Sequence, residues 1–282
     1  MRFAVLAAVL ALALLLMAAP KTAGAEAPAQ RIVTLSPHLA ELVCAVDACG
    51  ELVAVSAFSN YPPELAKLDV IGDTGNLGYE RLLALRPTRI YAWAGGTPDW
   101  QLAKLRQLGL PVTALQINSL AEVASTLQQL GNSLGHASAG AKAAARFRTG
   151  LAELTRRYQH EKKLRVFYQI ETSPAYTVNA ASPISQVIAL CGGINVFGTL
   201  PTLSAPVSAE AILAARPDVV LHSEENDRAI RRFWSRFPDT PVSRLHNIYG
   251  INPDLLTRAG PRLLQGAEAV CAALNAARAA RP

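Results

Sequence analysis

Short apolar runs rich in β-branched residues alternate along this chain with segments whose apolar residues recur every three or four positions. The first pattern is typical of strands buried on both faces, and the second of amphipathic helices. The runs predict strands at Ile32–Leu35, Leu52–Val55, Arg89–Trp93 and Val112–Leu115, and again at Arg165–Ile170, Asn195–Phe197, Val219–His222 and Val242–Leu245. Because strands and helices alternate, we expect an α/β fold with parallel sheets.

The helical segments fall between these strands. They predict helices from Ser36, at Glu80–Leu85, Asp99–Leu108, Leu120–Leu130 and Ser185–Leu190, from Glu210, through Ile230 to Trp234, and from Pro261 to about Ala277. In the helix at 99–108, Trp100, Leu105 and Leu108 are expected to face the same way. A longer helix, Ala137–Lys162, separates the two sets of strands and has an apolar stripe on one face. This arrangement predicts two Rossmann-like lobes joined by a stiff backbone helix, with a ligand cleft that closes by small tilts.

One stretch of the chain is repeated at an offset of 130 positions. Residues 80–90 (ERLLALRPTRI) resemble residues 210–220 (EAILAARPDVV), and the similarity continues at the same offset into the strand predicted at Val242–Leu245. A fixed offset across several elements indicates two lobes that are built alike. Glu80 and Glu210 then occupy matching surface positions, which suggests a partner that contacts both lobes at once.

The N-terminal segment has the pattern of a secretory signal peptide. Arg2 precedes an almost wholly apolar stretch at 4–19, and Ala23-Gly24-Ala25 provides a cleavage site. The apolar stretch is short for a membrane anchor, and no cysteine closely follows it. We therefore expect a soluble, exported protein with four parts, namely a signal peptide (1–25), an N-terminal α/β lobe (26–135), a linking helix (136–162) and a C-terminal α/β lobe (163–282).

Charge and cysteine content narrow the choice of partners. The formal net charge is +6, and loss of Arg2 and Lys21 with the signal peptide would lower it to +4. The basic residues are scattered, so nucleic acid is not an expected partner. Four cysteines in an exported protein predict disulfides. Four cysteines can form two disulfides in three different ways. In one of these arrangements, Cys44–Cys49 would close a short loop and Cys191–Cys271 would tie the C-terminal helix to the second lobe.

Motifs for catalysis or metal binding are not convincing. Residues 131–135 match Gly-x-Ser-x-Gly, but a helix precedes them where a nucleophile elbow needs a strand, so we interpret them as a helix end and loop. The five histidines lack ligand spacing. His38 is placed to face a cleft, although a structural role is favoured. Neither an enzyme nor a resident metal is expected; an exported hydrolase would need a nucleophile, base and acid at strand ends.

Aromatic residues lie at predicted strand ends instead. Ligands of open parallel sheets bind outside the carboxyl ends of the strands. Tyr61 follows the second strand, Trp93 ends the third, and Tyr176 lies in the loop after the first strand of the second half. Their shared position favours a flat, partly apolar ligand held between the lobes. Glu80 and Glu210 also have a structural explanation, because the helix dipole favours a carboxylate in the first turn of a helix.

The chain also resembles a known family. The resemblance is carried, in order, by Ile32–Pro37, Tyr61-Pro62-Pro63, Glu80-Arg81, Ala92–Gly96, Cys191–Phe197 and Arg258–Arg262. It covers nearly all of the chain after the signal peptide. The family is that of the helical-backbone (class III) periplasmic binding proteins of ABC importers, and the chain is most similar to its cobalamin-binding members.

This resemblance implies a function and assigns roles to residues. The lobes would hold cobalamin or a related corrinoid without covalent chemistry, and a monomer in the periplasm would deliver it to an ABC importer permease dimer with its ATPase subunits. Glu80 and Glu210 match docking residues for the permease. Residues matching ligand contacts are Tyr61, Trp93, Tyr176, Asp254 and Arg258, and the family disulfide matches Cys191–Cys271.

Two positions depart from the family pattern. Thr74 and Ser204 stand where the family has tryptophans shortly before the two docking glutamates. The loss of two aromatic walls is compatible with a different corrinoid, such as cobinamide. Haem or a ferric siderophore, held by the same fold, is the alternative ligand class; Tyr61 or His38 would then be placed to reach iron. The pairing of Cys44 with Cys49 lies outside the matched pattern.

Overall fold

Two parallel sheets form the framework of the computed structural model, which describes residues 29–280. The predicted signal peptide at 1–25 lies outside these residues. The first sheet has the order β3-β2-β1-β4-β5, with strands β1 Ile32–Thr34, β2 Leu52–Val55, β3 Asp69–Val70, β4 Arg89–Trp93 and β5 Val112–Leu115. The second has the order β11-β10-β6-β8, with strands β6 Leu164–Gln169, β8 Gly193–Asn195, β10 Val219–Ser223 and β11 Ile248–Ile251. All neighbours in both sheets are parallel, as predicted.

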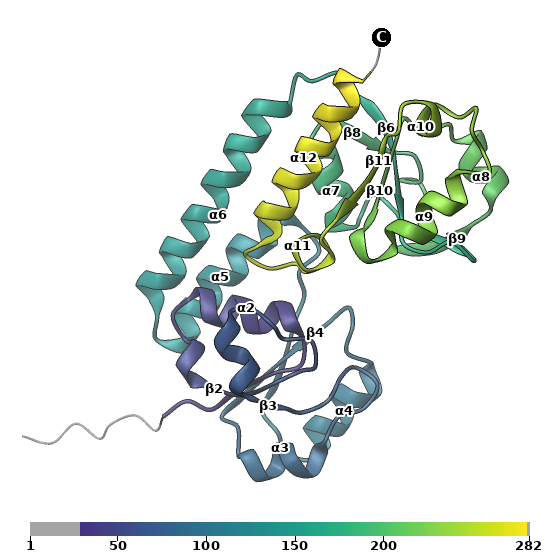
Figure 1. Cartoon of the computed structure of the whole chain (residues 1–282). Helices are drawn as coiled ribbons and strands as arrows, with labels where there is room; N and C mark the ends of the chain where they lie inside the picture. The colour runs from purple at the N-terminus through teal and green to yellow at the C-terminus, as the bar shows by residue number, and fades with distance from the viewer. Residues whose placement is uncertain (1–28, 281–282) are drawn as a thin grey trace, which may run out of the picture. The chain divides into compact units, whose positions relative to one another are not determined.

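Helices cover the sheets and connect the two lobes (Figure 1). Those associated with the first half are α2 Pro37–Ala45, α3 Tyr79–Leu85, α4 Asp99–Gln107 and α5 Leu120–Leu134. Those after it are α6 Ala137–Tyr158, α7 Pro183–Leu190, α8 Ala209–Ala214, α9 Asp227–Trp234, α10 Pro241–Arg244, α11 Pro253–Leu256 and α12 Leu263–Ala279. The long helix α6 runs beside α12 (Figure 1). Among the described residues, no helix combines the length and apolar character needed to cross a bilayer.

One continuous hydrophobic core links the two lobes. Its buried members include Leu39 of α2, Phe147 of α6, Val166 of β6 and Val270 of α12. On β6, Val166 faces this shared core, whereas the next residue, Phe167, faces a separate core beneath α9. The first lobe likewise has an outer core of its own. Because the central core spans both lobes, the burial of apolar surface couples their stabilities.

A pair of glycines allows α5 and α6 to pack closely. A Cβ atom on Gly131 would lie 2.6 Å from the Cα of Gly140, so neither position has room for a side chain. Helix α5 continues through Ser133 to Leu134 and ends at Gly135, whose φ of 84° suits glycine. The interpretation of 131–135 as a helix end and loop is right for the helix end, which falls at Gly135, and wrong for the loop, because residues 131–134 are helical and Gly131 is needed for helix packing.

The repeat extends to backbone conformation. The segments that follow α3 and α8 place Arg86 and Arg216 in the left-handed region, with φ of 46° and 43°. Each arginine precedes a proline, which disfavours a right-handed helical conformation at the residue before it. The two lobes therefore stop corresponding helices in the same way.

The repeat ends at the strand predicted at Val242–Leu245, and that prediction is wrong. Residues 241–244 form the short helix α10, and the strand of this region is β11. Thr240 accepts a hydrogen bond from Ser243 N and Pro241 occupies the first turn, both of which favour a helix start. In the first lobe, Leu110 precedes the corresponding proline and has no oxygen with which to cap a helix.

Three further details differ from expectation. Tyr176 lies in a strand rather than a loop, because β7 Ala175–Val178 pairs antiparallel with β9 Ser204–Val207, a ribbon that the sequence pattern did not reveal. Strand β3 was also not predicted. On α4, Trp100 is exposed whereas Leu105 is buried, so the two do not share a face.

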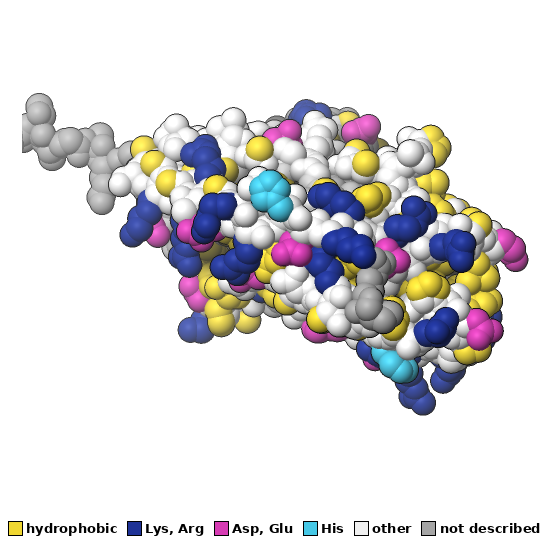
Figure 2. Space-filling view, turned by 90° about the horizontal axis from the view of Figure 1, so that it is seen from above, with side chains coloured by type: hydrophobic (Ala, Val, Ile, Leu, Met, Phe, Trp, Pro, Cys, Tyr) yellow, Lys and Arg dark blue, Asp and Glu magenta, His cyan; other side chains and the backbone are white. Residues whose placement is uncertain are grey.

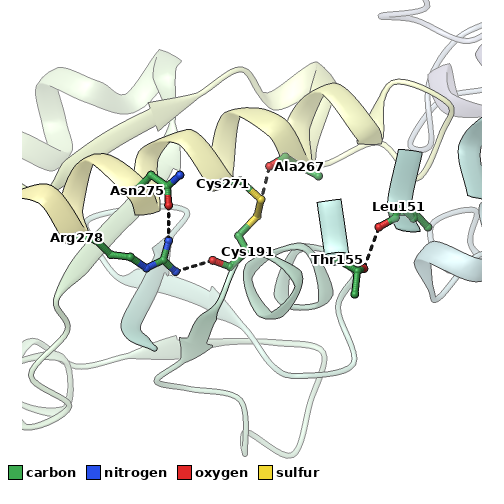
Figure 3. The surroundings of a disulfide bond; sticks show 7 residues. All are labelled: Leu151, Thr155, Cys191, Ala267, Cys271, Asn275 and Arg278. Carbon is green, nitrogen blue, oxygen red and sulfur yellow. Dashed lines mark hydrogen bonds between the residues drawn. A yellow bond between two sulfur atoms is a disulfide. The ribbon is translucent and has the colours of Figure 1, made fainter. Parts of the chain in front are cut away.

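Two disulfides reinforce the fold. Cys191, directly after α7, is bonded to Cys271 of α12, and Arg278 donates a hydrogen bond of 2.7 Å to the Cys191 carbonyl (Figure 3). Cys44 of α2 is bonded to Cys49 in the following turn. The first bond joins segments 80 residues apart and the second only 5 apart, so they constrain very different lengths of chain.

Candidate functional site

The predicted aromatic contacts lie on exposed edges of the two lobes. Tyr61 is in the loop after β2, Trp93 is the last residue of β4, and Tyr176 is on β7. Their exposed fractions are 43%, 36% and 37%, which leaves part of each ring open to a ligand. Trp93 lies at the carboxyl end of β4 and Tyr61 in the loop that follows the carboxyl end of β2, and ligands of parallel sheets bind at this edge.

Glycines hold Trp93 in place. The indole lies against Gly95 and Gly96, and a Cβ atom on Gly96 would overlap the ring. The backbone N–H of Trp93 donates to Thr97 Oγ1 at 3.2 Å, and Thr97 N donates back to the Trp93 carbonyl at 2.8 Å. The sequence Trp-Ala-Gly-Gly-Thr therefore forms a compact turn that supports one face of the indole.

His38 supports the same ring from its edge. The His38 and Trp93 rings meet edge to face, with centroids 5.4 Å apart. His38 is buried, and its Nδ1 shares a hydrogen bond of 2.5 Å with Ser36 Oγ. Burial, and then the positive charge of Arg258, lower the pKa of His38 to about 4. His38 is therefore neutral at physiological pH, and its Nε2 is buried without a hydrogen-bond partner.

A buried carboxylate organises the residues around Tyr61. Glu41 of α2 is 3% exposed, and Arg262 donates to both of its oxygens, from Nε at 2.9 Å and from a terminal nitrogen at 2.7 Å. These hydrogen bonds raise the pKa of Arg262 above its usual value. The guanidinium of Arg262 also lies over the Tyr61 ring, 4.1 Å from its centroid. Glu41 thus fixes a cation that supports one face of Tyr61.

Arg258 joins the same cluster. Its guanidinium donates to Glu41 at 3.1 Å and to Asn60 Oδ1 at 2.7 Å, and it pairs with Asp254 at 2.5 Å. Asn60 in turn donates to Asp254 at 2.8 Å. We call these residues the Glu41 cluster; its members are Glu41, Asn60, Asp254, Arg258 and Arg262. It connects α2 and the loop after β2 with the segment from α11 to α12.

The cluster includes two predicted contacts and three residues that the sequence did not single out. Asp254 and Arg258 are predicted ligand contacts, and the structure brings them beside Tyr61 through Asn60 and Arg262. Glu41, Asn60 and Arg262 were missed. Glu41 does leave a signal, because a lone carboxylate interrupts an apolar helical stripe between Leu39 and Leu42. Tyr176 takes no part in this cluster.

The two departures from the family pattern lie in exposed positions. Thr74 is in a turn before α3. Ser204 opens β9 opposite Val178, and its hydroxyl donates to the Thr177 carbonyl at 3.0 Å. Both side chains are too small to form an aromatic wall, so the surface at these points is less apolar than the family pattern would make it.

The two matched glutamates are exposed on helix starts. Glu80 is in the first turn of α3 and Glu210 in the first turn of α8. Ser208 accepts a hydrogen bond from Ala211 N as the cap of α8. The backbone N–H of Glu210 and the Ser208 hydroxyl lower the pKa of Glu210, so this carboxylate is ionised at neutral pH.

Two surface hollows lie outside this site. The larger, of about 610 Å³, is between α3 and α4, and the smaller, of about 380 Å³, is beside α8 and α10. Neither is lined by Tyr61, Trp93 or Tyr176. On the face drawn in Figure 2, Lys and Arg side chains are interspersed with acidic and uncharged ones.

Two α/β lobes share one core, and partly open aromatic rings lie at or beside strand ends, which is the arrangement of a two-lobed binding-protein fold. Residues 32–236 match the periplasmic binding protein family, and the chain belongs to that family. The family is one of substrate-binding transport proteins.

Individual relatives are similar along nearly the whole chain. The vitamin B12-binding protein of Vibrio cholerae serotype O1 is 35% identical over 252 residues, 89% of this chain and 91% of that protein. The crystal structure of the periplasmic vitamin B12-binding protein of Vibrio cholerae has a TM-score of 0.82 at 34% identity, covering 89% and 98% of the two chains. A periplasmic haem-binding protein of Roseiflexus sp. RS-1, in its apo form, has a TM-score of 0.77 at 26% identity, covering 88% and 99%.

Proposed function

We propose that this protein binds cobalamin or a related corrinoid between its two lobes and delivers it to an ABC importer. The observation that carries the proposal is the 35% identity to a vitamin B12-binding protein over 89% of the chain. The partly exposed rings of Tyr61 and Trp93, each supported on another face, suit a flat macrocycle with an apolar surface.

In this role the site binds without reacting. Tyr61, Trp93 and Tyr176 would provide apolar contact area, and Asp254 would accept hydrogen bonds from amides on the corrin rim. Arg258 already donates to Glu41, Asn60 and the Phe58 carbonyl, so its main contribution would be to position Asp254. The rigid cluster would lower the ordering cost of binding.

Delivery would use the matched acidic residues. Glu80 and Glu210 would pair with basic residues of the two permease subunits, and such pairs set orientation and encounter rate more than affinity. The protein would act as a periplasmic monomer after removal of residues 1–25. The lobes at 26–135 and 163–282, joined by the helix at 136–162, would each present one glutamate.

Haem is the second candidate ligand, on the strength of the likeness to the haem-binding protein at 26% identity. The lower identity and the arrangement of candidate iron ligands make it the weaker one. The Nε2 atom of His38, which would have to bind the iron, is buried.

Calorimetric titration with cyanocobalamin, dicyanocobinamide and haemin tests the proposal. We expect tight one-to-one binding of at least one corrinoid and much weaker binding of haemin. Binding of haemin alone, with an iron-ligand absorption band, would replace the corrinoid function by haem capture. If neither the corrinoids nor haemin gave a detectable heat of binding, both candidate functions would be rejected.

A further inference from the structure

Phe58 is an aromatic residue that the family resemblance does not assign to the site. It is 78% exposed, the largest exposed fraction among the large apolar side chains of the described residues. It lies three residues before Tyr61, in the same loop after β2. This is the carboxyl-end edge of the first sheet, where Trp93 also lies.

The backbone at Phe58 is held in an unfavourable conformation. Its φ is 65°, in the left-handed region that bulky residues rarely occupy. Glycine or asparagine would adopt this conformation at lower cost. Neither the exposed ring nor the strained backbone stabilises the folded protein by itself. Strained residues of this kind cluster at sites where ligands bind.

The surrounding contacts fix Phe58 on both sides. Its carbonyl accepts a hydrogen bond of 3.1 Å from Arg258, which the Glu41 cluster holds in place. Before it, Ala57 N donates to the Gly72 carbonyl at 2.8 Å, and after it, Ser59 is buried and shares a hydrogen bond with Ser56. The loop is therefore ordered on both sides of a ring that itself remains open to solvent.

We propose that Phe58 is a further ligand-contacting residue, an aromatic wall that packs against the apolar edge of the corrin beside Tyr61. This inference rests on the proposed corrinoid function. It also accounts for the small residues at Thr74 and Ser204, because an aromatic wall supplied from the β2 loop offsets apolar contact area missing there. Arg258 acts as a positioning residue for this wall through the Phe58 carbonyl.

The test compares stability and affinity in the same variants. Phe58→Gly relieves the left-handed strain, so we expect its thermal midpoint to equal or exceed that of the wild type. The same variant should bind cyanocobalamin about 10–100-fold more weakly in calorimetry, the loss expected for one aromatic contact. Phe58→Ala should show a similar loss of affinity, and Phe58→Trp should bind within a few-fold of the wild type.

Two exposed positions provide matched controls. Arg86→Gly relieves strain at another left-handed residue, and Trp100→Ala removes another exposed ring; both should leave cyanocobalamin affinity unchanged. Wild-type affinity in Phe58→Ala and Phe58→Gly would overturn this inference while leaving the corrinoid function intact. Wild-type affinity combined with reduced transport would also overturn it, because the ring would then contact the permease. Failure of the wild-type protein to bind any corrinoid would reject both proposals.

Discussion

The indole of Trp93 lies directly on the backbone of Gly96, in a space that any larger residue at position 96 would fill. His38 meets the same indole edge to face. Gly96 and His38 therefore set the orientation of the indole. Either residue can be substituted without altering the exposed part of the ring.

Trp93→Ala is expected to weaken corrinoid binding by about 1–3 kcal/mol, the range for loss of a large apolar contact. Calorimetric titration measures this directly. Gly96→Ala, which pushes the indole aside while keeping it, should change affinity in the same direction. Unchanged affinity in Trp93→Ala would remove Trp93 from the binding site.

Glu41→Gln is expected to lower the free energy of unfolding by roughly 3 kcal/mol, because it leaves two guanidiniums without their buried counter-charge. Urea denaturation provides the measurement. Asp69→Asn breaks the exposed ion pair between Asp69 and Arg81 and serves as the control, with a much smaller loss. Equal losses in the two variants would contradict the assigned role of the Glu41 cluster.

His38 should make stability depend on pH. Its pKa is about 4 in the folded protein, below the ordinary value of about 6.5 in the unfolded chain. The unfolded chain therefore binds more protons between these values, so His38 costs no stability above pH 6.5 and destabilises the fold progressively as the pH falls toward 4. The full loss is roughly 3 kcal/mol. His38→Gln should flatten this part of the profile in urea denaturation; an unchanged slope would exclude His38 as its source.

The two disulfides should contribute unequally. In the chain-entropy treatment, loss of Cys191–Cys271, which spans 80 residues, costs about 4.5 kcal/mol, and loss of Cys44–Cys49, which spans 5, costs roughly 2 kcal/mol. Paired alanine substitutions, compared by thermal unfolding, measure the difference. A larger loss from the Cys44–Cys49 pair would show that chain entropy is not the governing effect.

Glu80→Lys combined with Glu210→Lys should abolish corrinoid transport and leave corrinoid affinity unchanged, because both residues are exposed and neither belongs to the proposed ligand contacts or to the Glu41 cluster. Uptake by cells and calorimetry on the purified protein measure the two properties. Glu153→Lys, on the exposed face of α6, is the matched control. Normal uptake by the double variant would refute the docking role.

The apolar pattern predicted the framework because its information is local. The strands at Leu52–Val55, Arg89–Trp93 and Val112–Leu115 have the predicted bounds. The wrong strand at Val242–Leu245 arose because the repeat suggested equal structure, whereas Thr240, which precedes the shared proline where the first lobe has Leu110, supplies a helix cap. At this position the local hydrogen bond of the helix cap determines the structure, and the similarity to the segment 130 residues earlier does not.

The candidate site was only partly predictable for the opposite reason. Glu41 and Arg262 are 221 positions apart, and no periodicity or spacing relates them. Tyr61 and Trp93 were singled out from their places at or after strand ends, which depend on topology alone. The buried charges that support those rings depend on side-chain packing, and packing becomes visible only in three dimensions.

The position of Arg258 and Arg262 near the end of the chain has a consequence for biosynthesis. A ribosome completes α2, and with it Glu41, more than 200 residues before it adds these arginines. Until then the first lobe holds an acidic group without its counter-ions, so a nascent chain cannot reach its final stability by folding from the N-terminus alone. A prematurely terminated product that lacks only residues 258–282 would keep every strand of the described residues and still carry this defect.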